Sequence, residues 1–179
     1  MAVAVSGGVD SMTLAVVAGR VQPETQVFHA ISPAVPAAAT ARVQRYAAAE
    51  NWRLTVIDAG EMDDEAYLSN PANRCYFCKT NLYDSVSRQT DLVLASGTNL
   101  DDLDDYRPGL VAAEEHDVCH PFVDLGISKS GLRAIAAELL LTDLQELPAA
   151  PCLSSRVTTG IAIDPELLPV VDEIGRAHV

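Results

Sequence analysis

Positive charge is the scarcest property of this sequence. Among 179 residues, 12 lysines and arginines stand against 25 aspartates and glutamates, which gives a net charge of -13. No stretch gathers the clustered Lys and Arg side chains with which proteins contact nucleic-acid phosphates. We therefore expect no nucleic acid as a partner of this chain alone, since binding of tRNA or DNA would need a second chain or domain.

Long apolar runs and cysteines are also few. The apolar start of the chain has no basic residues, contains Asp10 and is too short to span a bilayer, so we expect a soluble cytoplasmic protein with no membrane partner. Four cysteines, at positions 75, 78, 119 and 152, are a low density for this length, and two of them form a C-x-x-C pair. In a cytosolic protein that pattern favours metal binding or catalysis over a disulfide scaffold.

The residues that are present predict an α/β fold. Hydrophobic residues make up 49% of the chain, and short apolar runs alternate with helix-forming segments. The predicted strands are residues 2–5, 25–31, 53–58 and 91–95, and the predicted helices are residues 12–21, 37–50, 76–89, 128–141 and 165–174. This alternation predicts a parallel sheet with helices on both faces and with ligands outside the carboxyl ends of the strands. A break in the pattern at 147–151 predicts a first domain over 1–150 and a short segment over 151–179.

The stretch S-G-G-V-D-S lies between the first predicted strand and the first predicted helix. Its members are Ser6, Gly7, Gly8, Val9, Asp10 and Ser11. The first N–H groups of a helix have no partner within the helix, and with the positive end of the helix dipole they attract an anion. Glycines let a phosphate approach the main chain, the serines offer hydroxyl donors, and Asp10 can hold Mg²⁺ or cap the helix. The stretch predicts a phosphate-binding loop; the simpler interpretation is a serine-glycine turn before an ordinary helix.

This stretch differs from the P-loop of kinases and GTPases. No Gly-Lys-Ser/Thr follows the glycines, and no lysine occurs in the first 78 residues. It resembles instead the PP-loop of the ATP pyrophosphatase superfamily, whose members split ATP between the α and β phosphates and hand AMP to a substrate. That resemblance implies ATP and Mg²⁺ as ligands.

Two further stretches carry cysteines. Cys75 and Cys78 lie one helical turn apart near the predicted helix start, where the positive helix end and the flanking Arg74 and Lys79 favour thiolates, the form that soft metals require. A lone cysteine such as Cys152 is usually a small buried apolar residue. Its position in the loop P-C-L-S-S-R weakens that interpretation.

Four motifs occur in an order that resembles the LarE family of ATP-dependent sacrificial sulfur transferases. They are S-G-G-V-D-S at 6–11, N-R-C-Y-F-C-K at 73–79, G-T-N-L-D-D-L-D-D-Y-R-P-G at 97–109 and P-C-L-S-S-R at 151–156. Together they cover nearly the whole chain. The PP-loop alone would fit NAD synthetase, GMP synthetase or a tRNA thiolase equally well.

The resemblance implies roles for residues outside the first loop. Gly97 and Thr98 would lie near the nucleotide, and Asp105 and Arg107 would form part of the nucleotide or substrate mouth. Without the resemblance, the acidic run that contains Asp105 is most simply a solvated turn. Arg156 would neutralise a phosphate that the lysine-free loop leaves unpaired, or else is only a surface charge.

The resemblance also implies the chemistry. Family members adenylate a carboxylate of a pyridinium dicarboxylate mononucleotide and convert it to a thiocarboxylate, on the way to a nickel-pincer nucleotide. Single-cysteine members give up their own sulfur at the position of Cys152, whereas three-cysteine members, which this chain resembles, hold a [4Fe-4S] cluster with one iron open for sulfide. We therefore expect Cys75, Cys78 and Cys152 to bind a cluster, a nucleotide as substrate, and sulfide or another sulfur donor as partner.

Several alternatives remain open from the sequence. Cys75 with Cys78 and one distant cysteine also fits structural zinc or no metal at all. Cys119 is expected in the core at a strand start, although it could also close a four-cysteine site. The activity could be that of another PP-loop adenylase, either an ammonia-using synthetase or a tRNA thiolase, or the chain could be a non-catalytic nucleotide-binding subunit.

The chain also departs from the family pattern in length. Family members generally continue beyond the P-C-L-S-S-R loop into a region that helps to form the substrate pocket and the oligomer, and they often begin with an additional helix. We therefore expect 151–179 to be the start of a truncated C-terminal region. A homo-oligomer or a second chain would supply the missing part.

Overall fold

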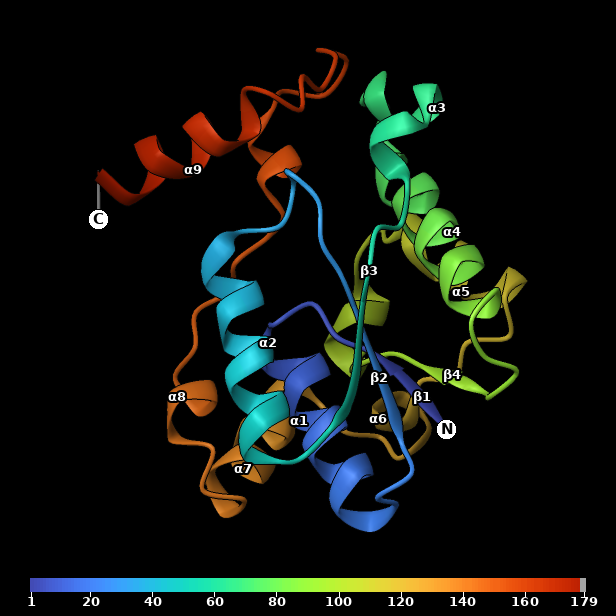
Figure 1. Ribbon diagram of the computed structural model, residues 1–179, viewed down its shortest axis with the longest axis vertical. Coiled ribbons are helices and arrows are strands. Elements are labelled where there is room, and N and C mark those ends of the chain that lie inside the picture. Colours follow the sequence, from blue (N-terminus) through green and yellow to red (C-terminus); the bar gives the residue numbers. More distant parts are fainter. Residues whose placement is uncertain (178–179) are drawn as a thin grey trace.

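The computed structural model describes residues 1–177, with side chains through residue 175. A four-stranded parallel sheet has the order β3-β2-β1-β4 (Figure 1). Its strands are β1 (Ala2–Ala4), β2 (Gln26–Ala30), β3 (Arg53–Ile57) and β4 (Leu94–Ala95). Each lies within a strand predicted from the sequence, and an isolated parallel bridge between Ala95 and Cys119 extends the sheet beyond β4. Cys119 therefore lies in the sheet, as expected for a core residue.

Helices connect the strands and continue beyond them. The α-helices are α1 (Val9–Val21), α2 (Ala37–Ala49), α3 (Glu65–Leu68), α4 (Arg74–Ser87), α5 (Pro108–Glu115), α6 (Pro121–Asp124), α7 (Lys129–Glu138), α8 (Thr142–Gln145) and α9 (Leu168–Ala177). Short 3-10 helices are η1 (Glu61–Asp63), η2 (Leu100–Asp104) and η3 (Leu153–Arg156). No helix within residues 1–177 is both long enough and apolar enough to cross a membrane.

The two faces of the sheet are buried by different helices. Alternate residues of a strand point to opposite faces, so Val3 packs with α1, α2, α7 and α8, whereas Ala2 and Ala4 pack with α4 and α5 (Figure 1). The α/β fold with helices on both faces is therefore confirmed. It leaves the carboxyl ends of the strands free to carry a site.

Two helix boundaries differ from the prediction in ways that affect the site. Helix α1 begins at Val9 rather than at residue 12, so Asp10 and Ser11 belong to its first turn. Helix α4 begins at Arg74 rather than at residue 76, so Cys75 and Cys78 both lie inside it.

The predicted helix 128–141 is also shorter than expected. Helix α7 ends at Glu138, because Leu140 adopts a left-handed backbone conformation with φ 61°. Leu140 is 81% exposed instead of lying on the apolar face. The apolar spacing of 132, 136 and 140 suits a longer helix, but the left-handed turn ends it and α8 begins at Thr142.

The C-terminal residues pack into a small third cluster. Leu153, Ile163 and Leu168 join Tyr67 of α3, and Phe77 and Cys78 of α4 pack against them. Helix α9 begins three residues later than predicted, at Leu168. This cluster brings the Cys152 motif to the start of α4.

Candidate functional site

The 6–11 loop leaves the carboxyl end of β1 and enters α1. Gly7 has a left-handed φ of 84°, and a Cβ added there would lie 2.8 Å from the carbonyl oxygen of Ala39. Because other residues rarely adopt that conformation, and because there is no room for a side chain, the loop requires glycine at this position.

Hydroxyl groups hold the loop in its turn. The Ser6 N–H donates to Ser11 Oγ at 3.0 Å, the two serine hydroxyls lie 3.2 Å apart, and the Gly8 N–H is 3.4 Å from Ser6 Oγ. Gly8 is the N-cap of α1 and supplies no side-chain cap. The N–H groups of the first turn therefore stay available to an anion at the positive end of the helix.

The loop after β4, residues 97–99, lies directly against the first turn of α1. A Cβ on Gly97 would come within 2.6 Å of the Ser11 backbone nitrogen, so only glycine allows this approach. The Asn99 amide donates to Asp10 Oδ1 at 3.3 Å. Both loops therefore open at the same edge of the sheet, at the carboxyl ends of the parallel strands β1 and β4.

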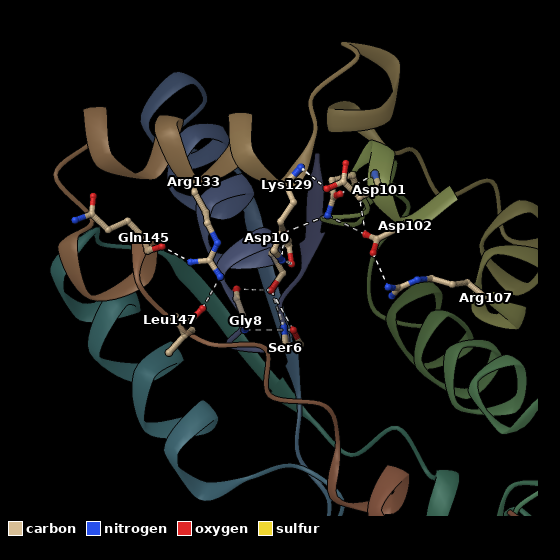
Figure 2. A network of polar contacts seen from close by, with 12 residues as sticks. Ser6, Gly8, Asp10, Asp101, Asp102, Arg107, Lys129, Arg133, Gln145 and Leu147 are labelled. Carbon is tan, nitrogen blue, oxygen red and sulfur yellow. Dashed lines mark hydrogen bonds and ion pairs between the residues drawn. The ribbon is translucent and has the colours of Figure 1, made fainter. Parts of the chain in front are cut away.

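An ion pair joins this edge to α7. Lys129 Nζ lies 2.7 Å from Asp10 Oδ1 and 2.5 Å from Asp10 Oδ2 (Figure 2). Sequence reasoning missed this lysine and treated 128–141 only as a helix. A signal existed, because Lys129 is one of only two lysines in the chain and begins a helix. The 6–11 loop contains no lysine or arginine, and the fold places the ammonium group of Lys129 beside it.

The network continues to Arg107. The Asn99 amide also donates to Asp102 Oδ2 at 3.0 Å, and Arg107 Nη2 lies 2.8 Å from Asp102 Oδ1 (Figure 2). Arg107 is therefore linked to the 6–11 loop through Asp102 and Asn99. Asp105, predicted beside it, is exposed, and its Oδ2 is 4.0 Å from Arg107 Nε.

Two further arginines donate hydrogen bonds to backbone carbonyl oxygens in and near the loop. Arg42 of α2 donates to the Gly7 carbonyl oxygen at 2.7 Å. Arg133 of α7 donates to the carbonyl oxygens of Gln145 and Leu147 (Figure 2). Arg42 thus orients the loop itself, whereas Arg133 holds α8 and the coil after it.

The Thr98 hydroxyl belongs to a hydrogen-bonded chain that also contains the Ser96 hydroxyl and the His120 imidazole. Ser96 Oγ lies 3.0 Å from Thr98 Oγ1 and 2.8 Å from His120 Nδ1. Burial lowers the pKa of His120. A neutral imidazole at this edge orients Ser96 and Thr98, and sequence reasoning had no signal for it beyond its place after Cys119.

Cys75 and Cys78 lie at the start of α4, and the segment that carries Cys152 packs against that helix start, away from Cys119. Cys75 is exposed, while Cys78 and Cys152 are partly buried. Burial raises the pKa of Cys78 to about 12, Lys79 lowers it only in part, and negative charge on Cys152 or Cys75 would raise it further. The expectation that Cys78 is a thiolate is therefore wrong for the free protein, because loss of hydration outweighs the nearby cation.

The cysteines do not form a ready site for a single metal ion. Within the part of the chain that the structure describes, no three Cys, His, Asp or Glu side chains are gathered closely enough to hold one. Cys119 packs instead against the core beneath α1 and α7.

Arg156 is exposed and contacts the C-terminal helix α9. Its Nη1 donates to the Val171 carbonyl oxygen of α9 at 3.3 Å, and a Cβ on Gly175 would clash with it. In this structure Arg156 holds η3 against α9.

Comparisons with known proteins give relatives whose function is uncharacterized. No protein-family model matches the chain. The chain is 38% identical to the uncharacterized protein slr1717 of Synechocystis sp., over 99% of this chain and 66% of that protein. It is 30% identical to the uncharacterized protein MJ0830 of Methanocaldococcus jannaschii, over 96% of this chain and 66% of that protein. The chain thus spans slightly less than two thirds of the length of these relatives.

A solved structure shares the fold. The chain is similar to the crystal structure of a predicted subunit of tRNA methyltransferase from Methanocaldococcus jannaschii, with a TM-score of 0.55 and 19% sequence identity. The similarity covers 77% of this chain and 75% of that one. At this identity it shows a common α/β architecture and no more.

Proposed function

We propose that this chain is an ATP-dependent sulfur transferase that adenylates a substrate carboxylate and then replaces an oxygen of that carboxylate with sulfur. One observation carries the proposal: the 6–11 loop presents the N-terminus of α1 at the edge of the sheet where Asp10, Asn99 and Lys129 meet. Helix N–H groups, a carboxylate and an ammonium group together suit a triphosphate and its Mg²⁺.

The charged residues at this edge have complementary tasks. Asp10 offers carboxylate oxygens, which Mg²⁺ prefers and commonly combines with phosphate oxygens. When Asp10 turns to the ion, its partner Lys129 is released to pair with the phosphate that carries the developing charge. The 6–11 loop amides would stabilise the departing pyrophosphate without rearrangement.

Adenylation makes a poor electrophile reactive. An oxygen of the substrate carboxylate attacks the α-phosphorus of ATP, the bond to the bridging oxygen breaks, and pyrophosphate leaves with that oxygen. The product is an acyl adenylate, and a sulfur nucleophile then attacks its carbonyl carbon and expels AMP to give the thiocarboxylate.

The three motif cysteines are the proposed sulfur site. Cys75, Cys78 and Cys152 lie near enough to influence one another electrostatically, yet they form no single-ion site. Three cysteine ligands would leave the fourth iron of a [4Fe-4S] cluster open, and the cluster would supply sulfide there. In the single-cysteine chemistry, Cys152 Sγ would instead attack the acyl adenylate and form a thioester as AMP leaves. Loss of the Cα proton and cleavage of the Cβ–Sγ bond would then release the thiocarboxylate and leave dehydroalanine at position 152.

The substrate assignment depends on the resemblance of four motifs to the LarE family. It favours a pyridinium dicarboxylate mononucleotide as substrate, a cytoplasmic location, and a homo-oligomer or a second chain as partner. The net charge of -13 speaks against tRNA as the acceptor.

The test measures ATP cleavage and metal content separately. We expect pyrophosphate release that requires the carboxylate nucleotide, and about four irons and four labile sulfides per chain after anaerobic purification. Cys152→Ala should lose sulfur transfer. Colourless protein without iron would reject the cluster, release stimulated by tRNA would indicate a tRNA thiolase, and ATP binding without turnover until a second protein is added would indicate a binding subunit.

A further inference from the structure

Asn70 is a buried side chain between the helices that precede and carry the C-x-x-C motif. It is 0% exposed and lies in the connection from α3 to α4. Its φ of 53° is left-handed, a conformation that asparagine adopts more readily than most residues. A buried amide must find hydrogen-bond partners for both of its ends.

The donor end of Asn70 is enclosed by the segment after Cys152. Its Nδ2 lies 2.9 Å from the Ile161 carbonyl oxygen, 3.0 Å from that of Thr158 and 3.4 Å from that of Val157. The backbone carbonyl oxygen of Asn70 accepts from the Gly160 N–H at 2.8 Å. The side chain and the backbone carbonyl group of Asn70 therefore both hold residues 157–161.

The acceptor end of Asn70 reaches the C-x-x-C motif. Its Oδ1 accepts from Arg74 Nη1, and the same Nη1 donates to the Ser154 carbonyl oxygen at 3.0 Å. Tyr67 of α3 adds a 2.7 Å contact between its hydroxyl and Ser154 Oγ. Arg74 immediately precedes Cys75, and Ser154 follows Cys152 by two residues. A single network therefore sets one cysteine segment against the other.

We propose that Asn70 is a positioning residue that holds Cys152 in register with Cys75 and Cys78. The chemical meaning of this register rests on the proposed function, because sulfur transfer needs the three thiols at one place. The structural part of the proposal does not depend on the sulfur chemistry. Without the Asn70 amide, the segment 153–163 separates from α3 and α4.

Two substitutions separate the contribution of the Asn70 side-chain amide from that of its left-handed backbone. Asn70→Asp keeps the shape and the bond from Arg74, but turns a carboxylate toward three carbonyl oxygens that need a donor. Asn70→Gly removes the side chain and keeps the left-handed conformation. Asn51 provides the matched control, because it is also left-handed, with φ 54°, but is exposed at the turn after α2.

The first measurement is hydrogen exchange by mass spectrometry. We expect the amides of 153–163 to exchange at least about tenfold faster in Asn70→Asp and Asn70→Gly, with β1 and α1 unchanged. The Asn51→Asp and Asn51→Gly variants should exchange like wild type. Unchanged exchange over 153–163 in both Asn70 variants would overturn the proposal.

The second measurement separates positioning from general stability. Iodoacetamide should alkylate Cys152 about fivefold faster in the Asn70 variants, while the exposed Cys75 in the same sample keeps its rate. Pyrophosphate release should stay within about twofold of wild type, whereas sulfur transfer should fall about 20-fold, because misplaced reacting groups lose rate steeply. Equal loss of both activities would indicate a structural role only and overturn the positioning claim.

The outcomes distinguish this inference from the proposed function. Faster exchange over 153–163 in the variants, with no sulfur transfer by wild type, would uphold the register of the cysteines and reject the sulfur chemistry. If neither Asn70 variant folds, wild-type exchange decides. The Gly160 and Ile163 amides, which donate to Asn70 and Leu68, should then exchange at least about tenfold more slowly than that of Thr159, and equal rates would overturn the inference.

Discussion

At the scale of single residues, the ion pair between Asp10 and Lys129 sets the charge at the start of α1. The ammonium group contacts both carboxylate oxygens, so it stands where a cation bound by Asp10 would stand. Each group is only partly exposed, with relative side-chain exposures of 33% for Lys129 and 26% for Asp10. The pair therefore balances the negative charge of Asp10 in the first turn of α1.

Removal of the lysine charge should separate metal binding from catalysis. In Lys129→Met we expect pyrophosphate release to fall about 100-fold or more, because a group that stabilises developing charge is lost. Binding of Mn²⁺ to the nucleotide-free protein, followed by electron paramagnetic resonance, should become tighter because Asp10 is freed.

The control for this prediction lies on the same helix as Asp10. Arg20→Met removes one positive charge near the opposite end of α1, where Arg20 pairs with Glu50 at 2.7 Å. It should leave both measurements unchanged. If Lys129→Met behaves like Arg20→Met, Lys129 has no part in phosphate chemistry.

At the scale of elements, the close approach of the 97–99 loop to α1 brings two strand ends into one site. Neighbouring parallel strands β1 and β4 end at the same edge, and the missing side chain of Gly97 lets their loops touch. Gly97 faces backbone atoms of Asp10 and Ser11, and these atoms cannot move aside unless α1 shifts.

Gly97→Ala should therefore disturb both stability and nucleotide binding. A Cβ within 2.6 Å of Ser11 N forces the elements apart, and we expect a loss of about 2 kcal/mol in the free energy of unfolding. Urea unfolding gives the stability, and calorimetric titration with ATP should show weakened binding.

Gly131→Ala is the matched substitution in α7. There the added Cβ would meet Ile127 and Ser128 side-chain atoms at 3.5 and 3.6 Å, which is ordinary contact. It should be neutral or stabilise by about 0.5 kcal/mol, since alanine favours a helix over glycine. Equal unfolding curves for Gly97→Ala and wild type would show that the two loops move apart easily.

At the scale of the whole molecule, buried His29 connects β1, β2 and α2. Its Nδ1 lies 2.8 Å from the Val5 carbonyl oxygen and its Nε2 lies 3.0 Å from Thr40 Oγ1. A carbonyl oxygen only accepts, so Nδ1 carries the proton and Nε2 accepts from the Thr40 hydroxyl. Burial lowers the pKa of His29 below its ordinary 6.5, and the folded protein therefore holds this ring neutral.

Stability should consequently fall in mild acid. The contribution of neutral His29 is complete above pH 6.5, its value in the unfolded chain, and is lost as the pH falls toward the lowered folded pKa. His120 acts in the same direction. We expect the free energy of unfolding, from urea titrations between about pH 5 and 7, to rise with pH.

His116 has the opposite effect on the pH dependence of stability, and it therefore provides a check on this prediction. Burial tends to lower the pKa of His116, but hydrogen bonds with Ala112 and Asp84 outweigh it and raise that pKa. His116 therefore stabilises the fold at low pH and loses that contribution as the pH rises through its raised pKa. His29→Gln should flatten the pH dependence and His116→Asn should steepen it; the reverse order would contradict these assignments.

Much of the architecture could be predicted because it depends on local patterns. Short runs rich in apolar residues lie at β1, β2, β3 and β4, and a strand followed by S-G-G-V-D-S placed the 6–11 loop correctly. Helix ends were less accurate, since the left-handed turn at Leu140 interrupts an apolar spacing that would suit a longer helix.

The sequence by itself determined the parallel sheet, the edge at which its loops open, and the residues of the 6–11 loop, because these follow from period and turn chemistry within a few residues. Only the tertiary structure decided that Lys129 pairs with Asp10, 119 positions away, and that Asn70 holds a segment 87 to 91 positions further on. It also decided that burial keeps the Cys78 thiol protonated. Such contacts arise when separate elements pack together, and that packing sets which charges meet and which groups lose water.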